Sequence, residues 1–170
     1  STQCAVAPDL DALHDCDLIL SASGAARPLL DRAPIRAGTV ICDVARPFDA
    51  GPALRARRDV LVLDGGLVAL PDPALRFGPG NLLGLPTGIQ LACLSETLLL
   101  ALAGHHRDCG IGDDIDLQTA HHIAALAAAH GFRLATPPAP PASFFASAAA
   151  PVRTAPLAPV APAALQPGAA

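Results

Sequence analysis

The stretch Asp59-Val60-Leu61-Val62-Leu63-Asp64-Gly65-Gly66 decides the fold. It is a continuous apolar run that ends in small and polar residues, and two similar runs precede it at residues 17–24 and 39–44. Continuous apolar runs, rather than alternating ones, are typical of parallel strands that are covered on both faces. The pattern predicts an α/β fold with a parallel sheet, and open sheets of this kind bind ligands beyond the carboxyl ends of their strands.

Two helices are predicted after the strands. The first covers about residues 87–103 and stops at Gly104, and the second starts near Asp116, a good N-cap, and ends at His130 before Gly131. The Gly- and Pro-rich residues 70–88 between the strands and the helices predict an irregular loop.

A Pro- and Ala-rich segment ends the sequence. From Thr136 onward nine of 35 residues are proline and Arg153 is the only charge, which predicts a disordered or polyproline-like tail. We therefore expect a folded domain over residues 1–135 and a tail over residues 136–170. Because the first strand comes only at residue 17 and the chain has no methionine, we also expect that an upstream part is missing.

Composition excludes several classes of partner. The net charge is −4 and no run of basic residues could neutralise a phosphate backbone, so nucleic acid is not expected to bind. The longest apolar stretch, residues 89–103, is shorter than the ~20 residues that a membrane crossing needs. Five cysteines without a CxxC pair argue against a disulfide framework and favour the reducing cytoplasm.

Cys93 is the candidate nucleophile of the sequence. It lies in the apolar stretch 90–100, which the loop would deliver as a helix beside the sheet, and a thiol in such a place can attack a thioester or an aldehyde. The alternative is a structural role, since a free cysteine usually behaves as a small buried hydrophobe. His106 is a second candidate, although a histidine just past a helix C-terminus is also favourable to the helix dipole.

Several segments together resemble the long-chain fatty acyl-[acyl-carrier-protein] reductases of cyanobacterial type. These are residues 91–102 with Cys93, the following Gly104-His105-His106, the strand regions 41–47 and 60–68, and His130-Gly131-Phe132. The similarity runs in matching order over residues 10–134. It implies the late strands of a Rossmann-like sheet with two C-terminal helices, whereas the glycine-rich turn and the helical N-terminal domain of that family have no counterpart here.

The resemblance implies NADPH-dependent reduction of a fatty acyl thioester to a fatty aldehyde. Cys93 would receive the acyl group from acyl carrier protein or acyl-CoA, His106 would align with a family histidine, and NADP would be the cofactor. Two alternatives stay open: another Rossmann-type NAD(P)-dependent dehydrogenase, and a catalytically inactive nucleotide-domain remnant that binds a partner without chemistry.

Small residues at the expected strand ends are the candidate cofactor-binding positions. In a Rossmann-like sheet they would let the cofactor approach the backbone near the ribose and the nicotinamide. They are Ala22, Ser23, Gly24, Pro47, Gly65 and Gly66. No metal site is expected, because the loosely metal-like set His105, His106, Cys109 and Asp113 holds only one thiol.

Overall fold

The computed structural model describes residues 4–106, 109, 116–137, 139–140 and 144. The chain divides into two compact units, one formed by Ser1–Gly65 with Pro137–Thr154 and the other by Gly66–Thr136 with Ala155–Ala170. The predicted tail, residues 136–170, lies almost wholly outside the described residues; of its few described positions, Phe144 is buried, with 1% of its surface exposed.

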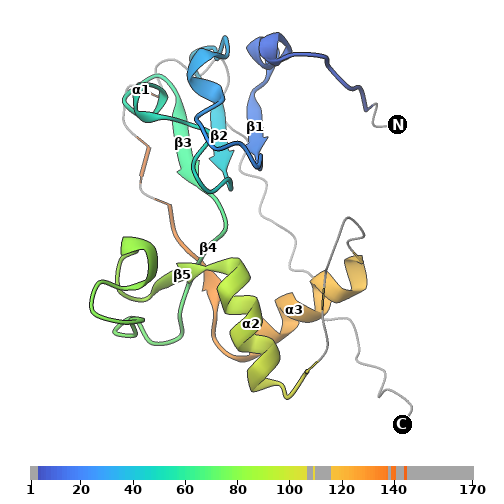
Figure 1. Ribbon diagram of the computed structural model, residues 1–170, viewed down its shortest axis with the longest axis vertical. Helices are drawn as coiled ribbons and strands as arrows, with labels where there is room; N and C mark the ends of the chain where they lie inside the picture. Colours follow the sequence, from blue (N-terminus) through green and yellow to red (C-terminus); the bar gives the residue numbers. More distant parts are fainter. Residues whose placement is uncertain (1–3, 107–108, 110–115, 138, 141–143, 145–170) are drawn as a thin grey trace. The chain divides into compact units, whose positions relative to one another are not determined.

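The first unit contains a three-stranded parallel sheet in the order β1-β2-β3 (Figure 1). Its strands are β1 (Leu18–Ser21), β2 (Val40–Asp43) and β3 (Leu61–Asp64), which confirms the three strands expected from the apolar runs. The connections are short, as their few residues require: η1 (Leu10–Asp15) precedes β1, η2 (Leu30–Arg32) precedes β2, and the single-turn helix α1 (Pro52–Arg55) precedes β3.

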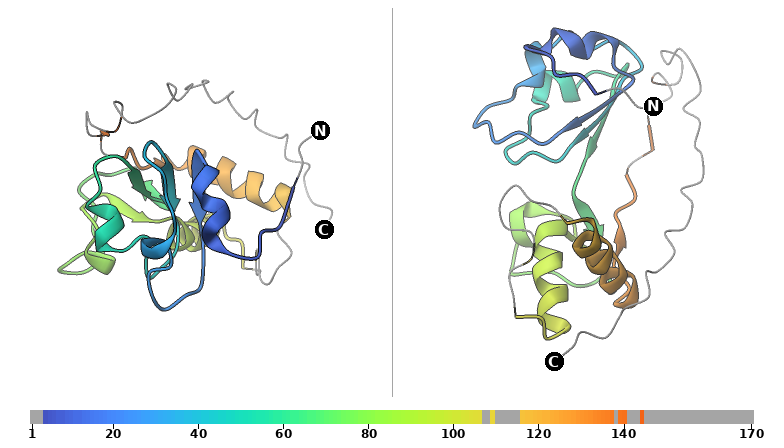
Figure 2. Two further views of the ribbon diagram at one scale, coloured as in Figure 1. Left: turned by 90° about the horizontal axis from the view of Figure 1, so that it is seen from above. Right: turned by 90° about the vertical axis from the view of Figure 1, so that its right-hand side faces the viewer.

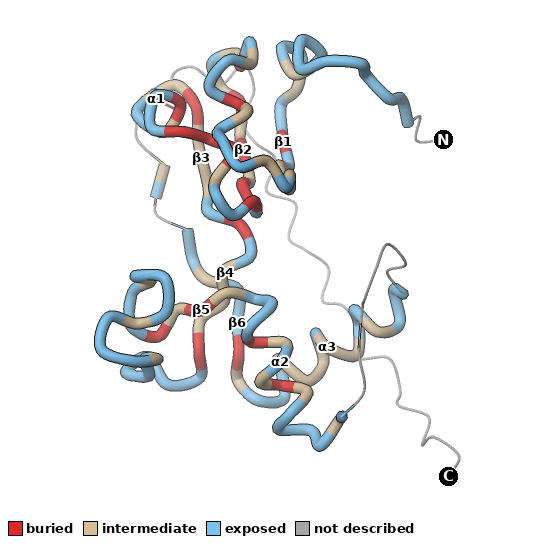
Figure 3. The backbone as a smooth tube through the Cα atoms, viewed as in Figure 1, coloured by how far each residue is buried: buried red, intermediate tan, exposed pale blue. Residues whose placement is uncertain are grey.

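One face of this sheet carries the core of the first unit. The buried strand residues Ile19 and Ile41 pack with Leu30 from η2 and Leu54 from α1. Buried and half-buried positions alternate along β2, as the red and tan segments of Figure 3 show. The prediction that both faces are covered fails at β1, where Leu18 and Leu20 on the other face are 66% and 70% exposed. The residues of β2 and β3 on that face are half-buried.

The second unit is built on a small antiparallel sheet in the order β5-β4-β6. The strands are β4 (Leu67–Ala69), β5 (Ile89–Leu91) and β6 (Arg133–Leu134), and the 3₁₀ turn η3 (Leu82–Gly84) lies in the loop between β4 and β5. Helices α2 (Ala92–Leu102) and α3 (Leu117–Ala129) lie side by side, as Figure 2 shows. Leu70, Leu99 and Phe132 form the buried core of this unit.

The helix predictions differ in accuracy. For α3 the predicted ends are confirmed: the Asp116 carboxylate accepts hydrogen bonds from the backbone N–H groups of Gln118 and Thr119, and Gly131 has φ +78°. The predicted start of α2 is five residues early, because residues 89–91 pair with β4 as a strand. Among the described helices, none combines the length and the hydrophobicity that a membrane crossing requires.

Candidate functional site

Three polar residues end the three parallel strands side by side. The strand register places Ser21 opposite Asp43, and Asp43 opposite Asp64. Residues paired in this way point to the same face of a sheet, and here this is the face that carries α1, since both Asp43 and Asp64 contact Arg55. The carboxyl edge of the sheet is thus polar, as the sequence analysis expected.

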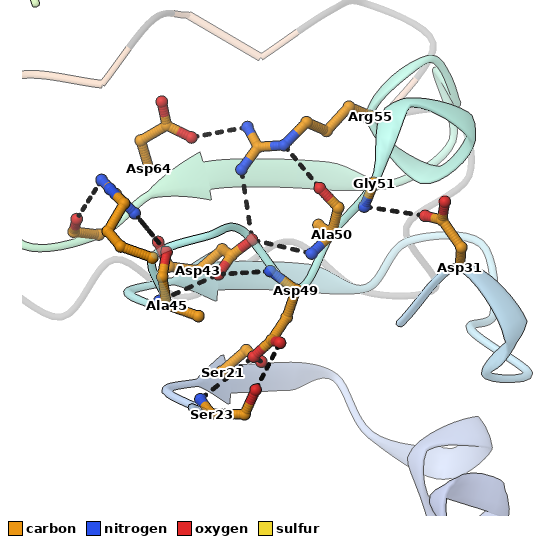
Figure 4. A network of polar contacts seen from close by, with 12 residues as sticks. Ser21, Ser23, Asp31, Asp43, Ala45, Asp49, Ala50, Gly51, Arg55 and Asp64 are labelled. Carbon is orange, nitrogen blue, oxygen red and sulfur yellow. Dashed lines mark hydrogen bonds and ion pairs between the residues drawn. The ribbon is translucent and has the colours of Figure 1, made fainter. Parts of the chain in front are cut away.

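Asp43 is the centre of this edge and is fully buried. Its carboxylate accepts hydrogen bonds from the backbone N–H groups of Ala45 at 3.2 Å, Asp49 at 3.4 Å and Ala50 at 2.9 Å, and from Arg55 Nη2 at 3.3 Å (Figure 4). A buried carboxylate is costly unless it is paired and hydrogen-bonded. Asp43 meets that condition by folding the loop 44–50 around its own side chain.

Asp49 closes the edge from the other side. It is also fully buried, and it accepts hydrogen bonds of 2.6 Å from the hydroxyl groups of Ser21 and Ser23 and one of 3.2 Å from the Ser23 backbone N–H (Figure 4). Burial acts to raise the pKa of Asp49, but the hydrogen bonds from the two serines outweigh it, so this pKa lies below the ordinary value. Asp49 therefore stays ionised at neutral pH.

Arg55 and Arg46 complete the network. Arg55 donates to Asp64 at 2.6 Å and to the Ala50 carbonyl at 2.9 Å, while Arg46 donates to the carbonyls of Ala45 and Gly65. The ring of Phe48 lies against both guanidinium groups, with centroid distances of 4.2 Å to Arg46 and 3.9 Å to Arg55. These cation–π contacts and charged hydrogen bonds hold the loop onto the strand ends.

Five of the six predicted cofactor-binding residues belong to the first unit, which holds this network. Ser23 is engaged with Asp49, Ala22 and Gly24 are exposed, and Pro47 follows a cis peptide bond. A Cβ at Gly65 would lie 2.6 Å from Val44 Cγ2 and 2.9 Å from Cys42 Sγ, so a side chain there is excluded by β2 and by the residue after it. Gly24 has open space, with no heavy atom within 4 Å of a Cβ built on it.

The sixth of these residues, Gly66, belongs to the second unit and lies next to the start of α2. It has φ +69°, and its carbonyl accepts a 2.7 Å hydrogen bond from the Ala92 backbone N–H. Cys93 follows as the second residue of α2, and its side chain is exposed. The structure therefore places the candidate thiol at the N-terminal end of a helix, beside the residue that precedes β4.

His106 lies beyond the opposite end of the same helix. From Cys93 to Leu102, the last residue of α2, the rise of ~1.5 Å per residue gives about 14 Å, and His106 lies four residues further on. A general base must come within hydrogen-bonding reach of the group it serves. The structure therefore does not bring Cys93 and His106 together.

A different thiol has an imidazole neighbour. Cys109 Sγ lies 3.4 Å from His105 Nε2, and the ring of His105 lies 6.4 Å from that of His122 on α3. In the sequence, His105 and Cys109 stand out only as members of a loosely metal-like set. In the described residues, which do not include Asp113, no group of three His, Cys, Asp or Glu side chains converges as a metal site would require.

Sequence reasoning missed Asp49 and Arg55. Both lie in the connection between β2 and β3, where the sequence predicts only a short helical or loop segment at residues 51–58. The available signal was the one carboxylate of residues 44–58, which stands among four arginines, since a buried polar group is almost always hydrogen-bonded to nearby donors. The serines at the end of β1 supply those donors.

Comparison with known proteins finds a relative for part of the chain. No family model matches the chain. The chain is similar to "Aminotransferase PigE" of Serratia sp. (strain ATCC 39006), with 34% identity over 124 residues, which is 72% of this chain and 14% of the relative. The chain thus spans about one seventh of the length of the curated relative that it matches.

This finding corrects the family resemblance and what it implied. The expected reductase of acyl thioesters, its NADP cofactor and the alternative NAD(P)-dependent dehydrogenase are wrong, because the relative is named as an aminotransferase; acyl carrier protein and acyl-CoA lose their support as partners. The resemblance depended on short apolar strands and a Leu-rich helix, which α/β proteins of unrelated function share for packing reasons. Over 124 residues the chain is instead similar to part of a protein that is named as an aminotransferase.

Proposed function

We propose that this chain is an accessory α/β segment of an aminotransferase-type protein and that it does not carry out transamination itself. Its kinship to such a protein is supported by the 34% identity over 124 residues. Its accessory role is supported by its composition, because the sequence contains eleven arginines and no lysine.

The missing lysine decides against pyridoxal phosphate in this chain. Enzymes that use this cofactor hold it as a Schiff base on a lysine amine. No side chain of these 170 residues can form that bond. The residues present therefore do not fit the cofactor, and we assign this chain no step of amino-group transfer.

The sheet of the first unit supports a binding or structural role. Its parallel strand order is compatible with a Rossmann-like half-sheet, the finer fold that we propose. The buried carboxylates at its carboxyl edge form hydrogen bonds with groups of the same unit. Asp43 and Asp49 are both fully buried and both have such partners. An edge of this kind favours the inactive-remnant alternative of the sequence analysis.

Reductive trapping tests this proposal. The chain is incubated with pyridoxal phosphate, reduced with borohydride and analysed by peptide mass spectrometry, with an established pyridoxal-phosphate aminotransferase as the positive control. We expect no pyridoxyl adduct on any side chain and no transfer of an amino group from glutamate to a keto acid. Amino transfer by the 170-residue chain alone would overturn the assignment.

We also propose Cys93 as a thiol that reacts with electrophiles. The supporting observation is that Cys93 is an exposed residue in the first turn of α2, and the proposal gives His106 no role in its reaction. Cys4 is a matched control because it is also exposed and lies outside any helix. We expect iodoacetamide to modify Cys93 faster than Cys4; equal rates would mean that Cys93 is an ordinary surface thiol. The five free cysteines also support our proposal of a reducing, cytoplasmic location.

A further inference from the structure

The second unit brings a thiol and an imidazole into contact beyond the C-terminal end of α2. Cys109 Sγ lies 3.4 Å from His105 Nε2, and both residues are half-buried. In the tautomer that carries its proton on Nδ1, the His105 ring accepts a hydrogen bond from the thiol. A cysteine and a histidine in this arrangement are the two parts of an activated sulfur nucleophile.

The other four cysteines have no such partner in the described part of the chain. Cys16 Sγ donates to the Ala12 carbonyl at 3.6 Å, and a carbonyl oxygen cannot take the proton of a thiol at neutral pH, whereas an imidazole can. The remaining three thiols have no hydrogen-bond partner among the described residues; they belong to Cys4, Cys42 and Cys93. The geometry therefore distinguishes Cys109 from the rest.

The end of α2 holds the imidazole in place. Gly104 has φ +66° and donates its backbone N–H to the Ala101 carbonyl at 3.1 Å. The His105 backbone N–H donates to the Leu100 carbonyl at 2.9 Å, and these two bonds form the Schellman motif that commonly ends a helix. The ring of His122 on α3 lies 6.4 Å from that of His105. The His105 backbone is thus fixed by α2, and its ring has a neighbour on a second helix.

We propose that Cys109 and His105 form a covalent modification site for carbon electrophiles of the α,β-unsaturated carbonyl class, in which His105 is the general base. The Cys109 sulfur bonds to the β-carbon, the π electrons of the C=C bond pass into an enolate, and the thiol proton moves to His105 Nε2. His105 then gives that proton to the α-carbon, which leaves a neutral thioether. The addition balances without an oxidant, a reductant or a leaving group.

Two features of the pair favour this chemistry. It lies just past the C-terminal end of α2, where the partial negative charge of the last carbonyl groups favours a cation over an anion. The route fits that position, because its charged form of the pair holds the proton on His105. Conjugate addition also suits a single imidazole, since it needs first a base at the sulfur and then an acid at the carbon. The site is separate from Cys93, at the other end of α2, and is independent of the accessory role proposed above.

The reaction rates of the five thiols test the site. The folded chain is treated with acrylamide, an α,β-unsaturated amide, and the adduct on each cysteine peptide is followed by mass spectrometry. We expect Cys109 to react at least about tenfold faster than Cys4, although Cys109 is half-buried and Cys4 is exposed. In urea the two thiols should react equally. A folded-state rate for Cys109 no higher than that of Cys4, or an excess that persists in urea, would overturn the proposal.

Two adjacent histidines provide a matched pair of variants. His105→Ala removes the imidazole that contacts the thiol, while His106→Ala removes an exposed histidine that contacts no thiol among the described residues. We expect His105→Ala to slow the Cys109 reaction at least about tenfold and His106→Ala to leave it unchanged. Free imidazole should restore part of the Cys109 rate in His105→Ala, without an equal gain at Cys4. Equal Cys109 rates in the two variants, or no rescue by imidazole, would contradict His105 as the base. If His105→Ala does not fold, the comparison with urea decides.

Discussion

The hydroxyl of Ser21, the last residue of β1, donates a 2.6 Å hydrogen bond to the carboxylate of Asp49, which lies 28 residues later. This bond joins the first strand to the loop that follows the second. Asp49 is fully buried and also accepts both the hydroxyl and the backbone N–H of Ser23. The end of β1 and the 44–50 loop are thereby held as one polar layer.

Replacing Asp49 by Asn should destabilise the protein. The amide nitrogen would face hydroxyl and N–H donors, and an unsatisfied buried polar group costs about 1–3 kcal/mol. Thermal unfolding followed by far-UV circular dichroism would show the loss. Asp15→Asn is the control, since the Asp15 side chain is 93% exposed and its pair with His14 contributes little. Equal melting of the two variants would show that the Asp49 hydrogen bonds do not stabilise the fold.

The same carboxylate should make stability depend on acid pH. Because the pKa of Asp49 is lower in the folded state than the ordinary value of about 3.9, its contribution is complete above that value and disappears as pH falls through the folded pKa. We expect the urea midpoint to fall below pH ~4. The pKa of Asp59 is also lowered, chiefly by its hydrogen bond with Arg57, so Asp49→Asn should make the fall shallower without abolishing it. Identical slopes for the variant and the parent chain would contradict this assignment.

Gly65→Ala and Gly24→Ala form a matched pair at two strand ends. The new Cβ at Gly65 would collide with Val44 and Cys42, and such overpacking costs about 1–3 kcal/mol. The Cβ at Gly24 meets nothing within 4 Å, so Gly24→Ala should be neutral or stabilise by up to about 1 kcal/mol. Chemical denaturation of both variants measures the difference. Tolerance of alanine at Gly65 would mean that β2 does not require glycine there.

Ser95→Ala should stabilise the second unit. The Ser95 hydroxyl is buried on α2 and has no hydrogen-bond partner in the part of the chain that the structure describes. Removing an unsatisfied buried hydroxyl and placing a better helix former should add about 1 kcal/mol. Thr97→Ala is the control, because its hydroxyl donates to the Cys93 carbonyl in an exposed turn. A lower Tm for Ser95→Ala would reveal a partner for that hydroxyl.

The sequence predicts the first unit better than the second. Each parallel strand is a continuous apolar run with a clear end, and α3 has an acidic N-cap and a glycine after its C-cap. The antiparallel sheet could not be predicted, because its strands have only two or three residues and pair across long separations. The start of α2 was misplaced because β5 continues into the helix without a break, and Leu91 provides no side-chain cap.

The candidate site was predictable only in outline. The strand ends locate the polar edge, but the bonds from Ser21 and Ser23 to Asp49 join residues 26–28 positions apart, which no local pattern reveals. The function was misjudged for a related reason. Short strands and a Leu-rich helix follow from packing requirements that many unrelated proteins share. Activity depends on particular functional groups, such as the lysine that this chain does not contain.

The position of Phe48 between Arg46 and Arg55 has a practical consequence for spectroscopy. The chain contains neither tryptophan nor tyrosine, so it is almost silent at 280 nm and has no intrinsic indole emission. A tryptophan introduced at position 48 would be the sole fluorophore and would lie against two cationic groups. Its emission would report opening of the strand-end loop separately from melting of the helices, a distinction that circular dichroism alone does not make.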